Sequence, residues 1–324
     1  MPTLHIFNPD NDYALASDNE YYTPPGQVIK LRRKLALLPA LYAQEGDAIL
    51  LLDEPLVKLS SLDYYDKVCE KGIRIITPGN LQNLKERIFS FNIRPWGWNR
   101  ALKKHILFHI GRMKGIPDNE TLRNIRNLSH RRTASELLTV MGSLLSDEIT
   151  IPKELTRIEE AVEEFSKNKK LFFKAPWSSS GRGLMLTDDL EIKHLIPWVR
   201  GIIRRQGSVM VEKAYERKFD FASEWMIQNS KPLFLGYSIF NVSRRGKYHG
   251  NLNETQSNIK KIIKNNAENW NDQFLELQHN AIAKVIANHY EGPLGIDMLV
   301  TQSGAINPCV EINLRQTMGM IGLL

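Results

Sequence analysis

A serine- and glycine-rich segment follows a short apolar run in the second half of the chain. Residues 172–184 read FFKAPWSSSGRGL, and Lys174 ends the apolar run, which predicts a lysine at a strand end, outside the core. Glycines let backbone amides approach phosphate oxygens, serine hydroxyls add donors, and lysine and arginine supply positive charge. No Walker GKS or GKT sequence follows the loop, so the segment is not a P-loop. Two interpretations remain open: a phosphate-binding loop and a plain surface turn. The candidate phosphate ligands are Lys174, Ser178, Ser179, Ser180, Gly181, Arg182 and Gly183.

Two late apolar runs predict a β-hairpin that carries acidic residues. Residues 294–300 and 306–314 flank a Ser-Gly turn. Glu311 and Asn313 share one face of the second strand because they are two residues apart, and Asp297 lies in the strand opposite. Two carboxylates and an amide oxygen suit magnesium. The apolar flanks predict a buried hairpin, and because burying unpaired carboxylates is costly, burial favours a bound metal. These three residues are therefore the candidate metal ligands, with a solvated hairpin face as the alternative.

A third segment, residues 209–220, reads VMVEKAYERKFD and passes from a buried strand into charged residues. The strand end can present backbone groups to an adenine ring. Glu212 and Asp220 are placed to reach the adenine amino group and the ribose hydroxyls. The alternative is a strand that leaves into an ordinary charged loop.

The elements that must hold these residues differ between the two halves of the chain. Apolar runs at 4–9, 48–52 and 73–76 alternate with helical patterns and predict an N-terminal parallel sheet. Ligands of such sheets bind at the carboxyl ends of the strands, so the loop 8–12 and the turn 78–80 are candidate substrate loops, with ordinary polar turns as the alternative. From residue 149 onward, short strands and amphipathic helices indicate an α+β arrangement.

Composition limits the class of protein. The 324 residues exceed one typical domain, and 42% hydrophobic and 24% charged residues are ordinary for a globular protein. Cys69 and Cys309 are too few for a disulfide framework and are expected to be reduced and buried. Neither a leader nor a membrane span is evident, so we expect a cytoplasmic protein without a membrane partner. The histidines and serines lack HExxH and GxSxG spacing, which argues against zinc hydrolase and triad chemistry.

The net charge of +7 raises the question of nucleic acid. Basic clusters occur at residues 30–34, 167–170 and 200–205. They lie beside apolar helical positions and lack interleaved aromatic residues for base stacking. This pattern favours solvated helix faces over a nucleic-acid interface.

Taken in order, the three segments resemble the ATP-grasp superfamily, which includes biotin carboxylase and D-alanine-D-alanine ligase. The resemblance covers residues 128–314, and the region before it resembles the pre-ATP-grasp domain of that family. It departs from the family at residues 129–134, SHRRTA, where many members carry Asp-Lys. Arg131 is the candidate for the first phosphate-contacting position there, since guanidinium pairs well with phosphate. The matching residues are Lys174, Ser178 to Gly183, Glu212, Lys213, Asp220, Asp297, Glu311 and Asn313.

The resemblance implies a fold of α/β and α+β class. Residues 1–115 would form the parallel-sheet domain and residues 116–324 an ATP-grasp domain. Its two lobes would be residues 129–208, with the phosphate loop, and 209–324, with the adenine edge and metal hairpin. The apolar tail 317–324 is expected to dock on the core rather than to act as a substrate lid.

The resemblance also implies ATP and Mg²⁺ as cofactors, with a small carboxylate and a nucleophile as substrates. ATP would phosphorylate the carboxylate to an acylphosphate, which an amine or another nucleophile would attack. Arg315 and either Arg244 or Arg245 are the candidates to hold the phosphoryl group or the carboxylate, with a solvated surface role as the alternative for that pair. Two other functions remain open: an ATP-grasp kinase, and a nucleotide- or nucleic-acid-binding protein without turnover.

Overall fold

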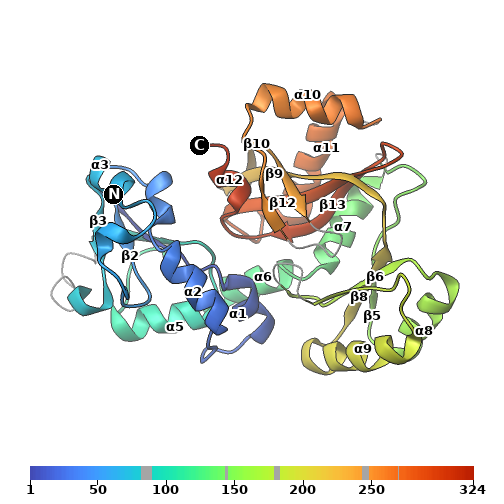
Figure 1. The fold of residues 1–324 in the computed structure, drawn as a ribbon, viewed down its shortest axis with the longest axis horizontal. Helices are drawn as coiled ribbons and strands as arrows, with labels where there is room; N and C mark the ends of the chain where they lie inside the picture. The colour runs from blue at the N-terminus through green and yellow to red at the C-terminus, as the bar shows by residue number, and fades with distance from the viewer. Residues whose placement is uncertain (82–89, 143–144, 179–182, 243–247, 269) are drawn as a thin grey trace. The chain divides into compact units, whose positions relative to one another are not determined.

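The computed structural model describes residues 1–324 except 82–89, 143–144, 179–182, 243–247 and 269 (Figure 1). The chain divides into two compact units. The N-terminal unit comprises Met1–Arg126 and the C-terminal unit Asn127–Leu323. The division lies inside a helix, Asn119–Leu128, and each unit has its own core.

The N-terminal unit is built on a four-stranded sheet in the order β3-β2-β1-β4, and every pairing is parallel. This confirms the predicted parallel sheet. Apolar strand residues such as Leu4, Ile6 and Ile76 are fully buried, because helices cover the sheet. The strands are β1 Thr3–Ile6, β2 Ala48–Leu50, β3 Arg74–Ile76 and β4 Asn92–Pro95. The helices are α1 Asn11–Ser17, α2 Gly26–Lys34, α3 Tyr65–Glu70, α5 Arg100–His109 and α6 Asn119–Leu128, with short 3₁₀ turns at Leu38–Leu41 and Leu59–Ser61.

The C-terminal unit begins with a four-stranded sheet in the order β5-β8-β6-β7. Two helices pack on it, and residues such as Phe165, Phe173 and Val199 form their common core. The sequence assigned β8 to the second lobe, but β8 pairs with β5 and β6 here. Its apolar start, Val209–Val211, completes the core of this sheet, which explains the difference. The elements are β5 Lys153–Leu155, α8 Ile158–Lys167, β6 Leu171–Lys174, β7 Leu184–Leu186, α9 Ile192–Gln206 and β8 Val209–Lys213.

A five-stranded antiparallel sheet follows, in the order β11-β10-β9-β12-β13 (Figure 1). Its core includes Phe221, Trp225, Tyr237 and Phe274, all nearly inaccessible to solvent. The strands are β9 Arg217–Gln228, β10 Lys231–Val242, β11 Tyr248–Asn251, β12 Gly292–Thr301 and β13 Ile306–Asn313. The helices are α7 Arg132–Val140, α10 Gln256–Asn266, α11 Asp272–Ile282, which continues as a π-helix at Ala283–Ala287, and α12 Met318–Ile321.

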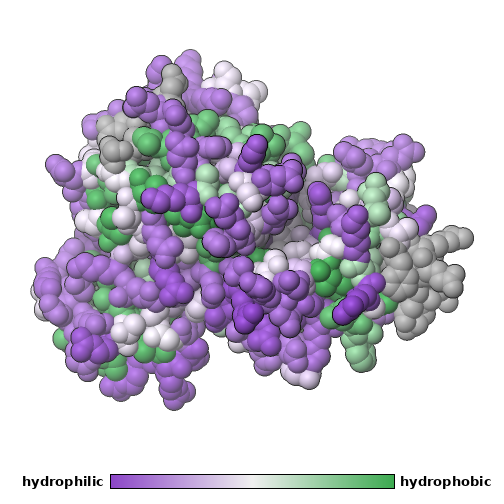
Figure 2. Space-filling model, turned by 180° about the vertical axis from the view of Figure 1, so that it is seen from behind, coloured by the Kyte–Doolittle hydropathy of each residue, from purple (hydrophilic) through white to green (hydrophobic). Residues whose placement is uncertain are grey.

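The structure decides two smaller expectations, on the C-terminal tail and on the cysteines. The C-terminal tail docks as predicted, since α12 contacts β9 and β10 and Met320 is buried. Cys309 is buried, but the prediction for Cys69 was wrong, because Val68 takes the inward position of α3 and leaves its neighbour exposed. Within the described residues, no helix combines the length and apolar character of a membrane span. Hydrophilic residues cover most of the face in Figure 2, with hydrophobic ones scattered between them.

Candidate functional site

A backbone hydrogen bond connects the two ends of the predicted phosphate loop. Lys174 is the last residue of β6, and the amide of Ala175 donates to the carbonyl oxygen of Gly183 over 2.8 Å. Gly183 has φ +74, and a Cβ there would lie 2.8 Å from Cβ of Ser178, so only glycine fits this close turn. The predicted residues Ser179, Ser180, Gly181 and Arg182 lie outside the described residues.

Lys174 and Glu212 form a buried ion pair. On the paired strands β6 and β8, Glu212 lies opposite Phe172, one step diagonal from Lys174, within reach of a long side chain. Burial lowers the pKa of Lys174, and Glu212 opposes this effect. The expectation that Lys174 lies outside the core was wrong: it is 4% exposed because β8 closes over the end of its strand.

Arg131 connects the loop to the hairpin. Its Nη1 donates to the carbonyl oxygen of Ala175 over 2.8 Å and to Oγ of Ser178 over 2.9 Å. Its Nη2 donates to Glu311 over 2.7 Å. Among the described residues its buried Nε has no hydrogen-bond partner. A guanidinium therefore lies beside the loop and the acidic strand, and the role of Arg131 as the first phosphate contact stays a prediction.

The hairpin brings its three predicted ligands together. Asp297 lies directly opposite Glu311, and Asn313 lies opposite Gly295 two residues along. Desolvation, followed by the charges of Glu311 and Glu224, raises the pKa of Asp297 well above its usual value. Arg315 and a hydrogen bond with Asn313 oppose the increase. Adjacent carboxylates that resist ionisation together are the environment that a divalent cation relieves.

The donor set fits magnesium but does not surround it. In the described part of the chain, no group of three or more His, Cys, Asp or Glu side chains is arranged to hold a metal ion. Magnesium commonly takes one or two carboxylates, completed by substrate phosphates and water. Asp297, Glu311 and the amide oxygen of Asn313 match that requirement.

The loop, the adenine segment and the hairpin share one charged environment. Burial raises the pKa of Cys309 well above its usual value, and the nearby charges of Asp297, Glu212 and Glu311 add to that increase while Lys174 opposes it. Cys309 thus lies among candidate ligands from all three segments. Sequence reasoning had assigned this thiol no role.

The two remaining residues predicted for the adenine segment, Asp220 and Lys213, differ in their surroundings. Asp220 is 8% exposed, burial raises its pKa, and Arg217 donates to it over 3.2 Å. Lys174 also lowers that pKa, so Asp220 belongs to the cluster. Lys213 instead donates to the carbonyl oxygen of Glu148 over 3.2 Å and lies above the ring of Tyr215. Its side chain is not brought to Glu212.

Solved structures share this arrangement of two sheets after a parallel-sheet unit. Biotin carboxylase from Campylobacter jejuni, in a β,γ-ATP complex, matches 97% of the chain with a TM-score of 0.56 and 14% identity, and the chain covers 65% of its length. The biotin carboxylase domain of Hydrogenobacter thermophilus 2-oxoglutarate carboxylase, with MgADP, ADP and bicarbonate, matches 99% with a TM-score of 0.54 and 12% identity, and 68% of it is covered. N5-carboxyaminoimidazole synthetase from Staphylococcus aureus, complexed with ADP, matches 97% with a TM-score of 0.53 and 12% identity, and 70% of it is covered.

The chain has the ATP-grasp fold. No protein-family model and no curated protein sequence matches it. Structure alone therefore shows this fold, because sequence identities of 12–14% are too low to show it. Sequence reasoning reached this fold through the order of its three motifs.

Arg315, predicted as catalytic in the ATP-grasp reading, lies directly after the hairpin. Its Nη2 donates to Oδ1 of Asn313 over 2.9 Å, and its charge lowers the pKa values of Asp297 and Glu224. Arg315 therefore joins the site. The other two predicted arginines, Arg244 and Arg245, lie outside the described residues.

Sequence reasoning missed Glu224, which lies on β9 opposite Gly295. It is 1% exposed and accepts hydrogen bonds from Ser238 over 3.0 Å and from Thr317 over 2.8 Å. Burial raises its pKa to about 7, against the effect of these donors and of Arg315. Glu224 is four residues from Asp220, so both lie on one face of a strand. This spacing was the feature of the sequence that could have identified Glu224 as a site residue.

Sequence reasoning also missed two contacts that support the candidate phosphate loop. The ring of His130 meets that of Trp177 edge to face at 4.6 Å. The side-chain amide of Gln206 accepts from the backbone N–H of Trp177 over 3.0 Å and donates to its carbonyl oxygen over 3.1 Å. The loop entrance is thereby held to α9.

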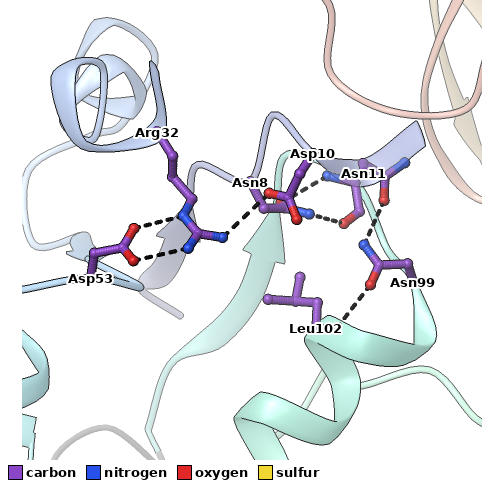
Figure 3. Close-up of polar contacts among 8 residues, drawn as sticks. Asn8, Asp10, Asn11, Arg32, Asp53, Asn99 and Leu102 are labelled. Carbon is purple, nitrogen blue, oxygen red and sulfur yellow. Dashed lines mark hydrogen bonds and ion pairs between the residues drawn. The ribbon is translucent and has the colours of Figure 1, made fainter. Parts of the chain in front are cut away.

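Internal contacts stabilise both candidate substrate loops of the N-terminal unit, and Figure 3 shows those of the loop 8–12. Asn8 donates to the carbonyl oxygen of Gly97 over 2.8 Å, and Asn99 contacts Asn11 and caps α5. In the second loop, Asn80 accepts from the backbone N–H of Thr77 over 2.8 Å. These amides are engaged in shaping the turns, so a ligand role for the two loops stays a prediction.

Proposed function

We propose that this ATP-grasp chain is an ATP-dependent ligase that activates a carboxylate for attack by an amine or another nucleophile. The observation that supports it most is the gathering of Lys174, Arg131, Asp297, Glu311 and Asn313 within one unit. These residues come from segments far apart in the sequence, yet ion pairs, register and mutual charge effects connect them. A phosphate group bound among them would meet the positive side chains directly and the carboxylates through magnesium.

Arg131, Lys174 and Ser178 would bind the phosphate oxygens of ATP. A guanidinium can hold two oxygens in a fixed plane, and Lys174 adds a charge that Glu212 keeps in place. Glu212 and Asp220, with the backbone of β8, would contact the adenine and ribose. Positioning and charge neutralisation of this kind account for most catalysis of phosphoryl transfer.

Asp297, Glu311 and Asn313 would hold Mg²⁺, which, when bound, neutralises charge on the phosphates. Arg315, anchored on Asn313, would hold the substrate carboxylate. A carboxylate oxygen attacks the γ-phosphorus, and the bond to ADP breaks. The nucleophile then attacks the acyl carbon, phosphate leaves, and the nucleophile loses its proton.

The test is an acylphosphate trap. Amino acids and dicarboxylates are screened with Mg-ATP and hydroxylamine, and ADP and acyl hydroxamate are measured together. A ligase forms both in equal amounts with the correct carboxylate, and without the trap it releases phosphate only when the nucleophile is also present.

Two other outcomes would favour the other candidate functions. An ATP-grasp kinase would give ADP and a stable phosphorylated product without hydroxamate. Binding of Mg-ATP without ADP formation for any carboxylate would reject the ligase proposal and favour a nucleotide-binding protein.

A further inference from the structure

The N-terminal unit contains a cavity of about 200 Å³ that none of the nucleotide-site residues line. Phe7 follows β1, and residues 50–52 end β2 and continue beyond it, so the cavity lies at the carboxyl edge of the parallel sheet. Pockets for drug-sized ligands measure roughly 300–1,000 Å³, so this one suits a smaller molecule. Its apolar lining consists of Phe7, Ala36, Leu50, Leu51, Leu52, Pro55, Leu56, Val57 and Leu62.

The charged lining comes from the end of α2 and from Asp53. Nε and Nη2 of Arg32 donate to the two oxygens of Asp53 over 2.7 and 2.9 Å, and Nη1 donates to Asp10 over 3.4 Å (Figure 3). This fork-like pairing occupies both carboxylate oxygens of Asp53 and all three nitrogens of Arg32. Neither residue therefore calls for a charged ligand.

Arg33, the next residue, is different. It lines the cavity, and within the described residues it has no hydrogen bond and no ion pair, while its Nε is buried without a partner. Buried polar groups are nearly always hydrogen-bonded, and each exception calls for an explanation. Lys34 also lines the cavity and adds a second positive charge. An anionic group bound in the cavity would accept a hydrogen bond from this nitrogen.

The apolar side of the cavity reaches the surface. Leu56 is 77% exposed and Val57 is 54% exposed, although both line the cavity. Exposed aliphatic side chains at the rim of an apolar cavity gain by covering with an apolar group. A ligand that satisfies Arg33 and also covers this rim must have an anionic head and an apolar body.

We propose that this cavity binds a small amphiphilic anion, with a carboxylate or phosphate head at Arg33 and an apolar body against Leu52, Leu56 and Val57. Charge-assisted hydrogen bonds to a guanidinium are strong and favour these heads over a hydroxyl or an ammonium group. The cavity lies within the N-terminal unit, and none of the residues proposed to bind ATP or magnesium line it. It can therefore be tested on the full chain without nucleotide.

The experiment is isothermal titration of the full chain with four compounds that share one body: phenylbutyrate, phenylbutyl phosphate, phenylbutanol and phenylbutylamine. We expect at least one anion to bind about tenfold or more tightly than the alcohol and the amine. The tighter of the two anions identifies the natural head group. Equal affinity for all four compounds, or no binding of either anion, would overturn the proposal.

Variants locate the site. Arg33→Gln should remove the preference for the anion, whereas Arg74→Gln, which deletes an exposed arginine of β3 in the same unit, should leave it unchanged. A double variant, Leu56→Ser with Val57→Ser, should weaken binding of the anions and of the alcohol alike. Both positions are exposed, so the fold should tolerate the substitutions. If Arg33→Gln and Arg74→Gln bind the anions equally, Arg33 does not hold the head and the proposal fails.

Discussion

Glu224 keeps a carboxyl group in the interior of the large sheet with two hydroxyl donors and no ion pair among the described contacts. Its pKa of about 7 compares with about 4.3 in an unfolded chain. A carboxyl group whose pKa rises on folding binds its proton more tightly in the folded state. Its contribution to stability is therefore full below about pH 4 and is lost as the pH rises through 7.

Replacing Glu224 with Gln should remove this pH dependence, because the amide keeps the size and stays neutral. We expect the two proteins to have similar free energies of unfolding at pH 5. At pH 8 the Glu224→Gln variant should be the more stable one, by about 2 to 3 kcal/mol. Urea unfolding at both pH values measures the difference, and a parallel pH dependence of the two proteins would contradict the assignment.

The Lys174–Glu212 pair predicts a different pattern of stability. Lys174→Met leaves a buried carboxylate without its partner and should destabilise the fold by about 3 to 5 kcal/mol. Adding Glu212→Leu should recover most of the loss, since the remaining charge disappears. Neither Lys174→Met nor the double variant should bind ATP, because both lack the lysine. Lys260→Met, at an exposed position of α10, is the matched control, and an equally small effect at both lysines would contradict the buried pair.

Glu311 is the sharpest test of the metal ligands. Glu311→Gln keeps the shape but removes the charge that would hold Mg²⁺, so turnover should collapse and the magnesium concentration for half-maximal activity should rise. Asp297→Asn should behave alike, and the two effects should not add, because both residues serve one site. Glu276→Gln, at an exposed position of α11, should change neither quantity. Normal magnesium dependence in both hairpin variants would reject the assignment.

For single residues, the sequence predicts local features of the site but not those that depend on strand pairing. The placement of Glu311 and Asn313 on one face of a hairpin opposite Asp297 could be predicted, because alternation along a strand is local. The burial of Lys174 could not, because it depends on which strand pairs with β6. Glu224 was missed for the same reason: β9 brings it to Asp297 only through pairing with β12.

At the scale of elements, apolar runs predicted the short buried strands well. They did not reveal β9, whose first residues Arg217, Lys218 and Asp220 are charged. This strand pairs along both edges, with β10 and β12, and packs aromatic residues such as Phe221 and Trp225 on one face. Tertiary pairing thus overrides a weak local preference for strand.

The docking of helix α12 against the large sheet can be tested with one substitution. A Cβ on Gly319 would overlap Glu224 and Ser238, so Gly319→Ala should displace the helix and lower the melting temperature by several degrees. The same change at Gly142, where a Cβ meets nothing within 4 Å, should be tolerated. Limited proteolysis should then cut the C-terminus of the Gly319 variant alone. Equal melting temperatures would mean that α12 is not held by this contact.

At the scale of the whole molecule, the proposed nucleotide site lies within one unit. Every described residue assigned to ATP or magnesium belongs to Asn127–Leu323. The cavity proposed for an amphiphilic anion belongs to Met1–Arg126. The two ligands should therefore be distinguishable by where each one protects the chain.

Saturating Mg-ATP should stabilise the protein, because a ligand that binds only the folded state adds RT ln(1 + [L]/Kd), or about 2.7 kcal/mol at a hundredfold excess over Kd. We expect a rise in melting temperature that magnesium or ATP alone reproduces only in part. Hydrogen exchange should slow most in peptides that contain residues 171–178, 209–213 and 306–313, which carry the phosphate loop flank, the adenine strand and the metal strand. Peptides from β2 and β3 serve as the internal reference. An unchanged melting temperature would remove the support for the nucleotide site, and protection confined to the N-terminal unit would place it elsewhere in the chain.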